Sequence, residues 1–136
     1  MGKIALVTGG SRGIGAATVK ALAQEGYDIA VNYNANGDAA EEVAGEARAS
    51  GVRAITVRAD VVQEDQVVAM FETVDRELGN LDALVNNAGI NGRSARVDEL
   101  MADEITALLQ TNVLGPMLCS REAVKRMSTK YGGAGG

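Results

Sequence analysis

Short apolar runs alternate with segments of helical period along this chain of 136 residues, and that alternation restricts the fold more than any other feature. The apolar runs predict strands at 3–8, 27–33, 52–59 and 81–86. Apolar residues three and four positions apart predict helices at 14–25, 38–49 and 66–78. Each connection is too long for a hairpin, so the strands are expected to run parallel, with helices on both faces. The sequence therefore predicts a single α/β domain over residues 1–136 with a doubly wound parallel sheet.

A longer helical pattern from Asp98 or Asp103 to about Met127 is interrupted by a Gly-Pro pair at 115–116. Proline has no N–H group, so the carbonyl of Asn112, four residues before it, loses its usual helical donor. The pattern predicts a distorted helix at this point. From the residues alone, a simple proline kink with no chemical purpose is the preferred explanation.

The composition excludes several classes of function. The chain has 18 acidic and 13 basic residues, a net charge of −5 and no block of positive charge, which argues against a nucleic-acid or membrane partner. It has no histidine, so it supplies neither an imidazole base nor an imidazole ligand, and we expect no bound metal. The single cysteine, Cys119, cannot form an internal disulfide, and no signal peptide is visible. A cytoplasmic location is therefore the default expectation.

The first predicted strand leads directly into a glycine-rich stretch, TGGSRGIG at 8–15. In a doubly wound sheet, ligands bind beyond the carboxyl ends of the strands, where the start of a helix directs unpaired N–H groups and a positive dipole end toward them. Glycine lets the backbone approach a phosphate without a collision at Cβ. The stretch predicts a phosphate-binding turn, and an ordinary glycine turn is the alternative.

Four motifs together make the chain resemble the short-chain dehydrogenase/reductase family. The family's nucleotide loop reads TGxxxGxG and its fourth strand ends in NNAG, and this chain has TGGSRGIG at 8–15 and NNAG at 86–89. It also has ADV at 59–61 and TNV at 111–113, in the family's order. The resemblance covers essentially every residue and implies a Rossmann-type fold, incomplete at its C-terminal side, that binds a nicotinamide dinucleotide. The branch of 3-oxoacyl-acyl-carrier-protein reductases and sugar dehydrogenases is the most similar.

The resemblance also implies where the cofactor lies. It assigns the pyrophosphate to Gly9, Gly13 and Gly15, and the adenine to Asp60 and Val61. The full set of cofactor-binding positions is Thr8, Gly9, Ser11, Arg12, Gly13, Ile14, Gly15, Asn32, Tyr33, Asn34, Asp60, Val61, Asn87, Ala88 and Gly89.

Simpler interpretations exist for some of these residues. Without the resemblance, Asp60 is explained as a cap for the turn before the next helix, and Asn86 and Asn87 as two turn-forming asparagines. The resemblance instead places the backbone of Asn87 to Gly89 along the adenosine ribose side and the cofactor. It also assigns Asn112 to the family's catalytic Asn-Ser-Tyr-Lys constellation, in which its backbone carbonyl holds a water of the proton relay.

The end of the second predicted strand favours NADP(H) over NAD(H). An NAD site usually has a carboxylate about 20 residues after the glycines, whereas the additional phosphate of NADP repels a carboxylate and attracts arginine. This chain has Asn32, Tyr33 and Asn34 there, with no acidic residue before Asp38. Arg12 in the glycine turn is able to reach the same phosphate, and the two asparagines are potential donors to it. The alternative is that Arg12 is a solvated loop residue.

The family's catalytic tyrosine and lysine occur as Tyr-x-x-x-Lys, and no tyrosine of this chain has a lysine four positions later. We therefore expect residues 1–136 to be the N-terminal, cofactor-binding part of a longer reductase, inactive alone. The complete protein would transfer hydride between nicotinamide and a small carbonyl or alcohol substrate, as a homodimer or homotetramer. Without later elements, the fourth strand would be an open edge and several apolar helix residues would be uncovered, namely Leu108, Leu109, Val113, Leu118 and Val124.

Two other functions fit parts of the sequence. One is a non-catalytic NADP-binding module or redox sensor. The other is a different α/β nucleotide fold, such as a methyltransferase that uses the glycine turn for adenosylmethionine. The NNAG motif at 86–89 argues against the second alternative.

Overall fold

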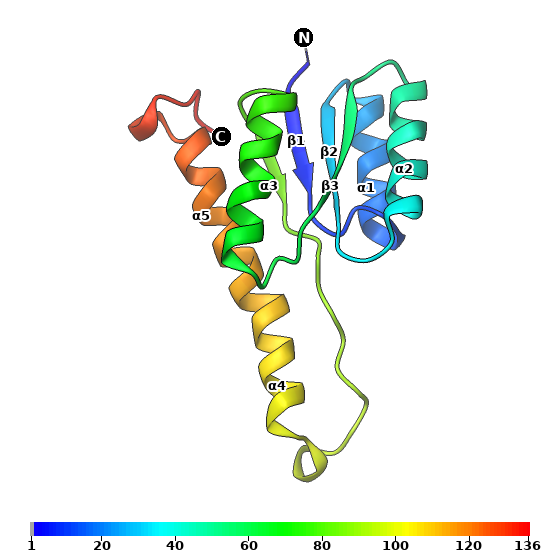
Figure 1. Ribbon diagram of the computed structural model, residues 1–136, viewed down its shortest axis with the longest axis vertical. Coiled ribbons are helices and arrows are strands. Elements are labelled where there is room, and N and C mark those ends of the chain that lie inside the picture. Colours follow the sequence, from blue (N-terminus) through cyan, green and yellow to red (C-terminus); the bar gives the residue numbers. More distant parts are fainter. Residues whose placement is uncertain (1) are drawn as a thin grey trace.

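A strand that is apolar on both faces belongs inside a parallel sheet, and Ile4–Val7 (β1) occupies that position in the computed structural model, which describes residues 2–136. β1 is buried along its whole length. It pairs with β2 (Asp28–Tyr33) on one side and with β4 (Ala83–Val85) on the other, and β3 (Ala54–Arg58) pairs with β2. All three pairings are parallel and the strand order is β3-β2-β1-β4, which confirms the predicted sheet (Figure 1).

Helices connect the strands and cover both faces of the sheet. They are α1 (Gly13–Gln24), α2 (Gly37–Ala49) and α3 (Glu64–Glu77), followed after β4 by α4 (Ala102–Leu109) and α5 (Gly115–Met127). Figure 1 shows α1 and α2 on one face and α3 and α5 on the other. Each strand and helix predicted between residues 3 and 86 is present, and the strands are shorter than the apolar runs.

The two faces are packed with side chains of different size. On the face of α3 and α5, the core contains Leu6, Met70 and Phe71. On the other face, the contribution of α2 is mainly alanine, with Ala40 and Ala44 fully buried. The helix α2 thus packs on the sheet mainly through small side chains, whereas large side chains fill the core beneath α3 and α5.

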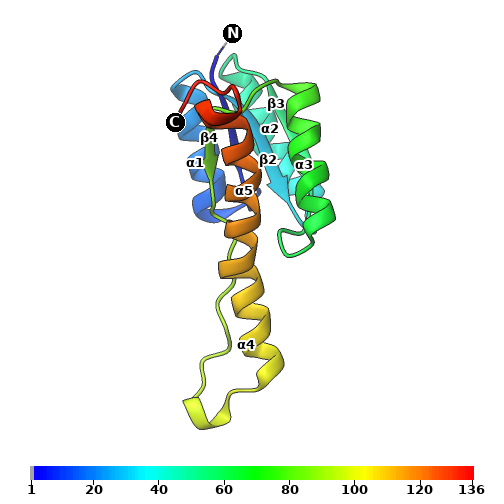
Figure 2. The same ribbon diagram turned by 90° about the vertical axis from the view of Figure 1, so that its left-hand side faces the viewer.

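Residues 102–127 form one long helical rod, made of α4, a π-helical segment and α5, that extends past the carboxyl edge of the sheet (Figures 1 and 2). A short 3-10 turn, Val97–Glu99, precedes α4, and another, Thr129–Tyr131, follows α5. The rod continues through 115–116, which corrects the predicted interruption, because Pro116 lies in the first turn of α5. The distortion lies just before it, in the π-helical segment Gln110–Leu114, where the N–H of Gly115 donates to the carbonyl of Gln110, five residues back.

The expected exposure of apolar side chains on this rod is confirmed for Leu109, Val113 and Val124, which are 57%, 48% and 54% exposed. Leu108 and Leu118 are half-buried. Leu118 differs from the prediction because it packs against the core on the face of α3 and α5. Among the described residues 2–136, β4 is an edge strand that pairs with β1 alone.

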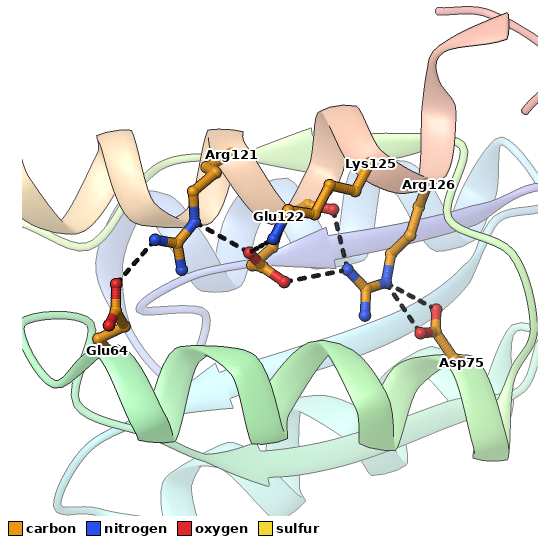
Figure 3. A network of polar contacts seen from close by, with 6 residues as sticks. All are labelled: Glu64, Asp75, Arg121, Glu122, Lys125 and Arg126. Carbon is orange, nitrogen blue, oxygen red and sulfur yellow. Dashed lines mark hydrogen bonds and ion pairs between the residues drawn. The ribbon is translucent and has the colours of Figure 1, made fainter. Parts of the chain in front are cut away.

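The buried carboxylate of Glu122 on α5 binds three cationic side chains (Figure 3). Glu122 is 3% exposed and accepts from Arg121 Nε at 3.0 Å, Lys125 Nζ at 2.9 Å and Arg126 at 3.4 Å. Burial by itself would raise the pKa of Glu122. The hydrogen bonds from Lys125 and Arg121 outweigh burial, so the pKa lies below its usual value.

The same cations connect α5 to α3. Arg126 donates to Asp75 at 2.8 Å and lies over the ring of Phe71, 5.1 Å from its centroid. Arg121 donates to Glu64 at 2.7 Å. The network therefore fixes the position of α5 against α3 in addition to the apolar contacts beneath it.

Glu122→Gln is expected to lower the free energy of unfolding by about 2 kcal/mol at pH 7, because it removes hydrogen bonds from three cations to one buried charge. The control is Glu42→Gln, which changes an exposed glutamate of α2 and should leave that free energy nearly unchanged. The measurement is urea denaturation of the wild type and both variants.

The effect of Glu122→Gln should depend on pH. The folded-state pKa is lowered, so the stabilisation is complete above the ordinary glutamate pKa of about 4.3 and is lost as the pH falls through the folded-state value. The difference between wild type and variant should shrink below about pH 4. A difference that is constant from pH 7 to pH 3 would contradict this role for the charge.

Candidate functional site

The glycine-rich turn connects the end of β1 to the start of α1 at the carboxyl edge of the sheet (Figure 1). Gly9 and Gly13 have φ angles of 61° and 56°, which residues other than glycine rarely adopt. A Cβ atom on Gly15 would collide with the carbonyl oxygen of Gly9 and would lie 2.5 Å from the side-chain nitrogen, Nδ2, of Asn87. The turn therefore depends on glycine at three of its positions.

The start of α1 is left open, unlike the starts of the other helices that follow strands. No side chain caps it and no acidic residue lies in its first turn. By contrast, the side chain of Asn36 caps α2, and α3 has Glu64 and Asp65 in its first turn. The side chain of Ile14 in the first turn of α1 is 80% exposed. The start of α1 thus combines a positive dipole end with N–H groups that no side chain caps and with no acidic residue in its first turn, as an anion site requires.

Asn32 supports the turn from behind. Its Oδ1 accepts from the N–H of Gly9 at 3.1 Å, and its Nδ2 donates to the carbonyls of Val57 and Ala59 at 3.2 and 3.1 Å. The carbonyl of Asn32 accepts from the N–H of Gly10 at 2.9 Å. Asn32 is 2% exposed, so its amide positions the turn and is not free to donate to a phosphate, which differs from the sequence-based hypothesis.

Thr8 and Asn87 join the glycine turn to the segment after β4. The hydroxyl of Thr8 accepts from the N–H groups of Asn87 and Ala88, each at 3.0 Å. The Asn87 side chain donates to the carbonyls of Thr8 and Gly9 at 3.0 and 2.9 Å. The neighbouring Asn86 donates instead to the hydroxyl of Ser120 at 3.1 Å. These hydrogen bonds hold the NNAG segment against the glycine turn. From the sequence, the two segments were expected to share the carboxyl edge of the sheet, but this direct contact was not predicted.

The ends of β2 and β3 form the other side of the site. Tyr33 is half-buried against Gly37, and Asn34 is exposed. The carboxylate of Asp60 accepts from the N–H of Val62 at 3.2 Å. This contact within a local turn resembles the capping role that the simpler interpretation gave Asp60. Asp60 also lines a cavity of about 610 Å³ with Asn34 and Arg58. Sequence reasoning missed Arg58, because nothing in a strand pattern distinguishes one charged end residue from another.

Val61 and Asn112 connect the site to the long helical rod. Val61 is 6% exposed and packs against Gly115, where a Cβ atom would lie 2.7 Å from a Val61 methyl carbon. The Asn112 side chain pairs with the backbone of Ile90, accepting from its N–H and donating to its carbonyl, both at 2.8 Å. Asn112 Oδ1 would lie 3.2 Å from a Cβ on Gly89, so glycine fits the close approach of this loop. The asparagine of the predicted catalytic set therefore positions the NNAG loop through its side chain.

The predicted site residues thus gather along the carboxyl ends of β1 to β4. Ser11 and Arg12 lie in the turn, half-buried and exposed respectively. Within residues 2–136, no group of three His, Cys, Asp or Glu side chains is arranged to hold a metal ion. None of the helices in that range has the length and apolar character needed to cross a bilayer. Cys119 is fully buried, and burial raises the pKa of its thiol to about 11, so it is not a nucleophile at neutral pH.

Comparison with known proteins gives a consistent result. A family model described as short chain dehydrogenase matches residues 3–134. An uncharacterized oxidoreductase of Escherichia coli strain K12 is 55% identical over 133 residues, which cover 98% of this chain and 54% of that protein. A 3-oxoacyl-acyl-carrier-protein reductase of Staphylococcus aureus is 41% identical over 134 residues, with the same coverage of 98% and 54%.

Solved structures are similar over the same part of the chain. A short-chain dehydrogenase from Burkholderia cenocepacia in complex with NADP has a TM-score of 0.87 and 43% identity, over 93% of this chain and 51% of that one. An alcohol dehydrogenase from Thermococcus sibiricus complexed with 5-hydroxy-NADP has a TM-score of 0.89 and 31% identity, over 98% of this chain and 56% of that one. The chain spans about half the length of the relatives it matches.

Gly15→Ala is expected to lower the free energy of unfolding by about 1–3 kcal/mol, because the added methyl group meets backbone in a closely packed turn. The matched control is Gly45→Ala in α2, where a Cβ atom has no neighbour within 4 Å. That variant should gain up to about 1 kcal/mol from helix propensity. Thermal and urea denaturation of the two variants compare them, and equal effects would contradict the close approach at Gly15.

Cys119 is expected to resist thiol reagents in the folded chain. With a pKa of about 11, its thiolate fraction at pH 8 is lower by roughly two orders of magnitude than that of an exposed cysteine. Labelling with a chromogenic disulfide should therefore be slow in buffer and fast in about 6 M guanidinium chloride, which unfolds even hyperstable domains. Fast labelling in buffer would show that α5 leaves the sheet readily.

Proposed function

The chain belongs to the short-chain dehydrogenase/reductase family, and from that membership we propose that residues 1–136 form the NADP(H)-binding half of an oxidoreductase. The complete protein would transfer hydride between nicotinamide and a carbonyl or alcohol substrate. The observation that carries the proposal is the uncapped start of α1, which follows a turn with glycine at positions 9, 10, 13 and 15. The chain covers 54% of the curated relatives, and the activity of the whole protein is part of the proposal.

The pyrophosphate of the cofactor would bind at the start of α1. The backbone N–H groups there have no side-chain acceptor, and Gly13 and Gly15 allow phosphate oxygens to approach the backbone closely. Ser11 adds a hydroxyl in the turn, and the exposed side chain of Ile14 offers an apolar surface to the cofactor. When bound, the nicotinamide would supply or accept the hydride.

The adenosine part would lie across the ends of β2, β3 and β4. Asp60 has one carboxylate contact in a local turn and capacity for further hydrogen bonds, which suits the amino group of adenine. Val61 would contact the ring edge, and the backbone of Asn87 to Gly89 would follow the ribose. Thr8 would act indirectly, by holding this backbone in place through its hydroxyl.

NADP(H) is proposed in preference to NAD(H) on electrostatic grounds. Arg12 is exposed beside the end of β2 and, among residues 2–136, has no carboxylate within 4 Å. The end of β2 offers Tyr33 and Asn34 and no acid, so a ribose 2′-phosphate meets no repulsion there. Two similar structures were solved with NADP or its 5-hydroxy derivative, which supports this preference.

Asn112 is proposed to assist proton transfer in the complete protein. Its side-chain oxygen and nitrogen both bind the backbone of Ile90, and its backbone carbonyl is the group proposed to hold a water. Pro116 removes the usual helical donor to that carbonyl. No Tyr-x-x-x-Lys occurs in residues 1–136, so we expect them to bind cofactor without catalysing hydride transfer. The apolar residues exposed on the rod would be covered by later segments or by a second subunit.

The chain should bind NADPH more tightly than NADH, and Arg12→Asp should weaken NADPH binding by at least tenfold, because it replaces a charge-assisted hydrogen bond with repulsion. Arg76→Asp is the matched control, since Arg76 lies in the last turn of α3 and pairs with its neighbour Glu77. Titration calorimetry with both cofactors gives the affinities.

Three outcomes would separate the alternatives. If the wild-type chain binds neither dinucleotide, the proposed function is wrong. If Arg12→Asp leaves the preference unchanged, Arg12 is a solvated loop residue. If a longer form of the protein binds NADPH but oxidises none with a panel of ketones and aldehydes, a non-catalytic binding module replaces the reductase.

A further inference from the structure

Two arginines differ from the others in their electrostatic surroundings. Within residues 2–136, seven of the nine arginines have a carboxylate oxygen within 3.2 Å. Arg12 and Arg58 have none within 4 Å, although the chain carries a net charge of −5. An acidic chain that leaves two guanidinium groups without carboxylates keeps them available for an anion from outside.

The two unpaired arginines lie on opposite sides of the end of β2. Arg12 comes from the turn after β1, and Arg58 is the last residue of β3. β2 lies between β1 and β3 in the sheet (Figure 1). Its last residue, Tyr33, is in register with Arg58. Both arginines therefore belong to the carboxyl edge where the adenosine ribose is proposed to bind.

The guanidinium of Arg58 is fixed at one nitrogen and free at the other two. Its Nε donates to the backbone carbonyl of Asn34 at 3.1 Å, which holds it beside the end of β2. The terminal nitrogens have no acceptor among residues 2–136. Arg58 lines a cavity of about 610 Å³ together with Asn34 and Asp60, and within residues 2–136 its guanidinium forms no ion pair with Asp60.

We propose that Arg58 is a second specificity residue for the ribose 2′-phosphate of NADP(H), acting opposite Arg12. This inference rests on the proposed function and deepens it. A phosphate dianion has three oxygens and accepts two charge-assisted hydrogen bonds from one arginine fork, so two arginines on either side of it satisfy it well. Arg58 then compensates for the absence of direct donation from Asn32, whose amide is used inside the fold.

The test compares Arg58→Gln with the wild-type chain by titration calorimetry, using NADPH, NADH and adenosine 2′,5′-bisphosphate as ligands. Arg58→Gln should weaken binding of NADPH and the bisphosphate by roughly tenfold and change NADH binding by less than about twofold. Arg58→Lys keeps the charge without the fork and should restore part of the loss. Arg76→Gln is the control and should bind all three ligands as the wild type does.

The outcomes distinguish this inference from the proposed function. If the wild type prefers NADPH and Arg12→Asp reduces that preference while Arg58→Gln does not, only the role of Arg58 is wrong. Equal weakening of NADPH and NADH would also overturn it, since that pattern indicates a contact to adenine or a displaced Asn34. If the wild type does not prefer NADPH, the NADP(H) assignment fails and Arg58 loses its ligand. Circular dichroism checks folding, and Arg58→Lys keeps the test decisive if Arg58→Gln does not fold.

Discussion

The candidate site depends on how the backbone of the glycine turn obtains its hydrogen bonds. Buried N–H and carbonyl groups need partners, and here side chains from neighbouring strands supply them: Asn32 from β2 binds Gly9, and Asn87 after β4 binds Thr8 and Gly9. These partners fix the turn, and among residues 2–136 no side chain caps the N–H groups at the start of α1 that follows it. A rigid turn and an open helix start therefore arise from one arrangement.

The second half of the chain completes the site from the other side of the sheet. α5 is held on α3 by the apolar core and by the cations around Glu122, and its start packs against Val61. The π-helical segment just before α5 carries Asn112, whose side chain holds the loop after NNAG. The rod thus connects the proposed adenine pocket to the NNAG loop. A π-helical segment at that position fits a functional distortion, because such segments recur at functional sites.

Much of the fold follows from local patterns. Strand and helix positions could be predicted because apolar residues repeat with periods that only one secondary structure satisfies, and the parallel sheet followed from the length of the connections. The course of the helix at 115–116 was not predicted correctly, because proline is tolerated in a first helical turn and the sequence does not show where a turn begins. Leu118 was misjudged since its burial depends on the rotation of α5 against the core.

The sequence by itself determined the strand order along the chain, the glycine turn and the absence of an acid at the end of β2, because each of these depends on residues that are neighbours or lie at a fixed spacing. Only the tertiary structure decided that Asn32 faces inward behind the turn and that Arg58, 46 positions from Arg12, shares an edge with it. The tertiary structure also decided that Arg58 has no carboxylate partner among residues 2–136. Both outcomes depend on how strands from distant segments pair and on which charges have already found partners. Pairing of that kind is a property of the assembled sheet and leaves no local pattern in the chain.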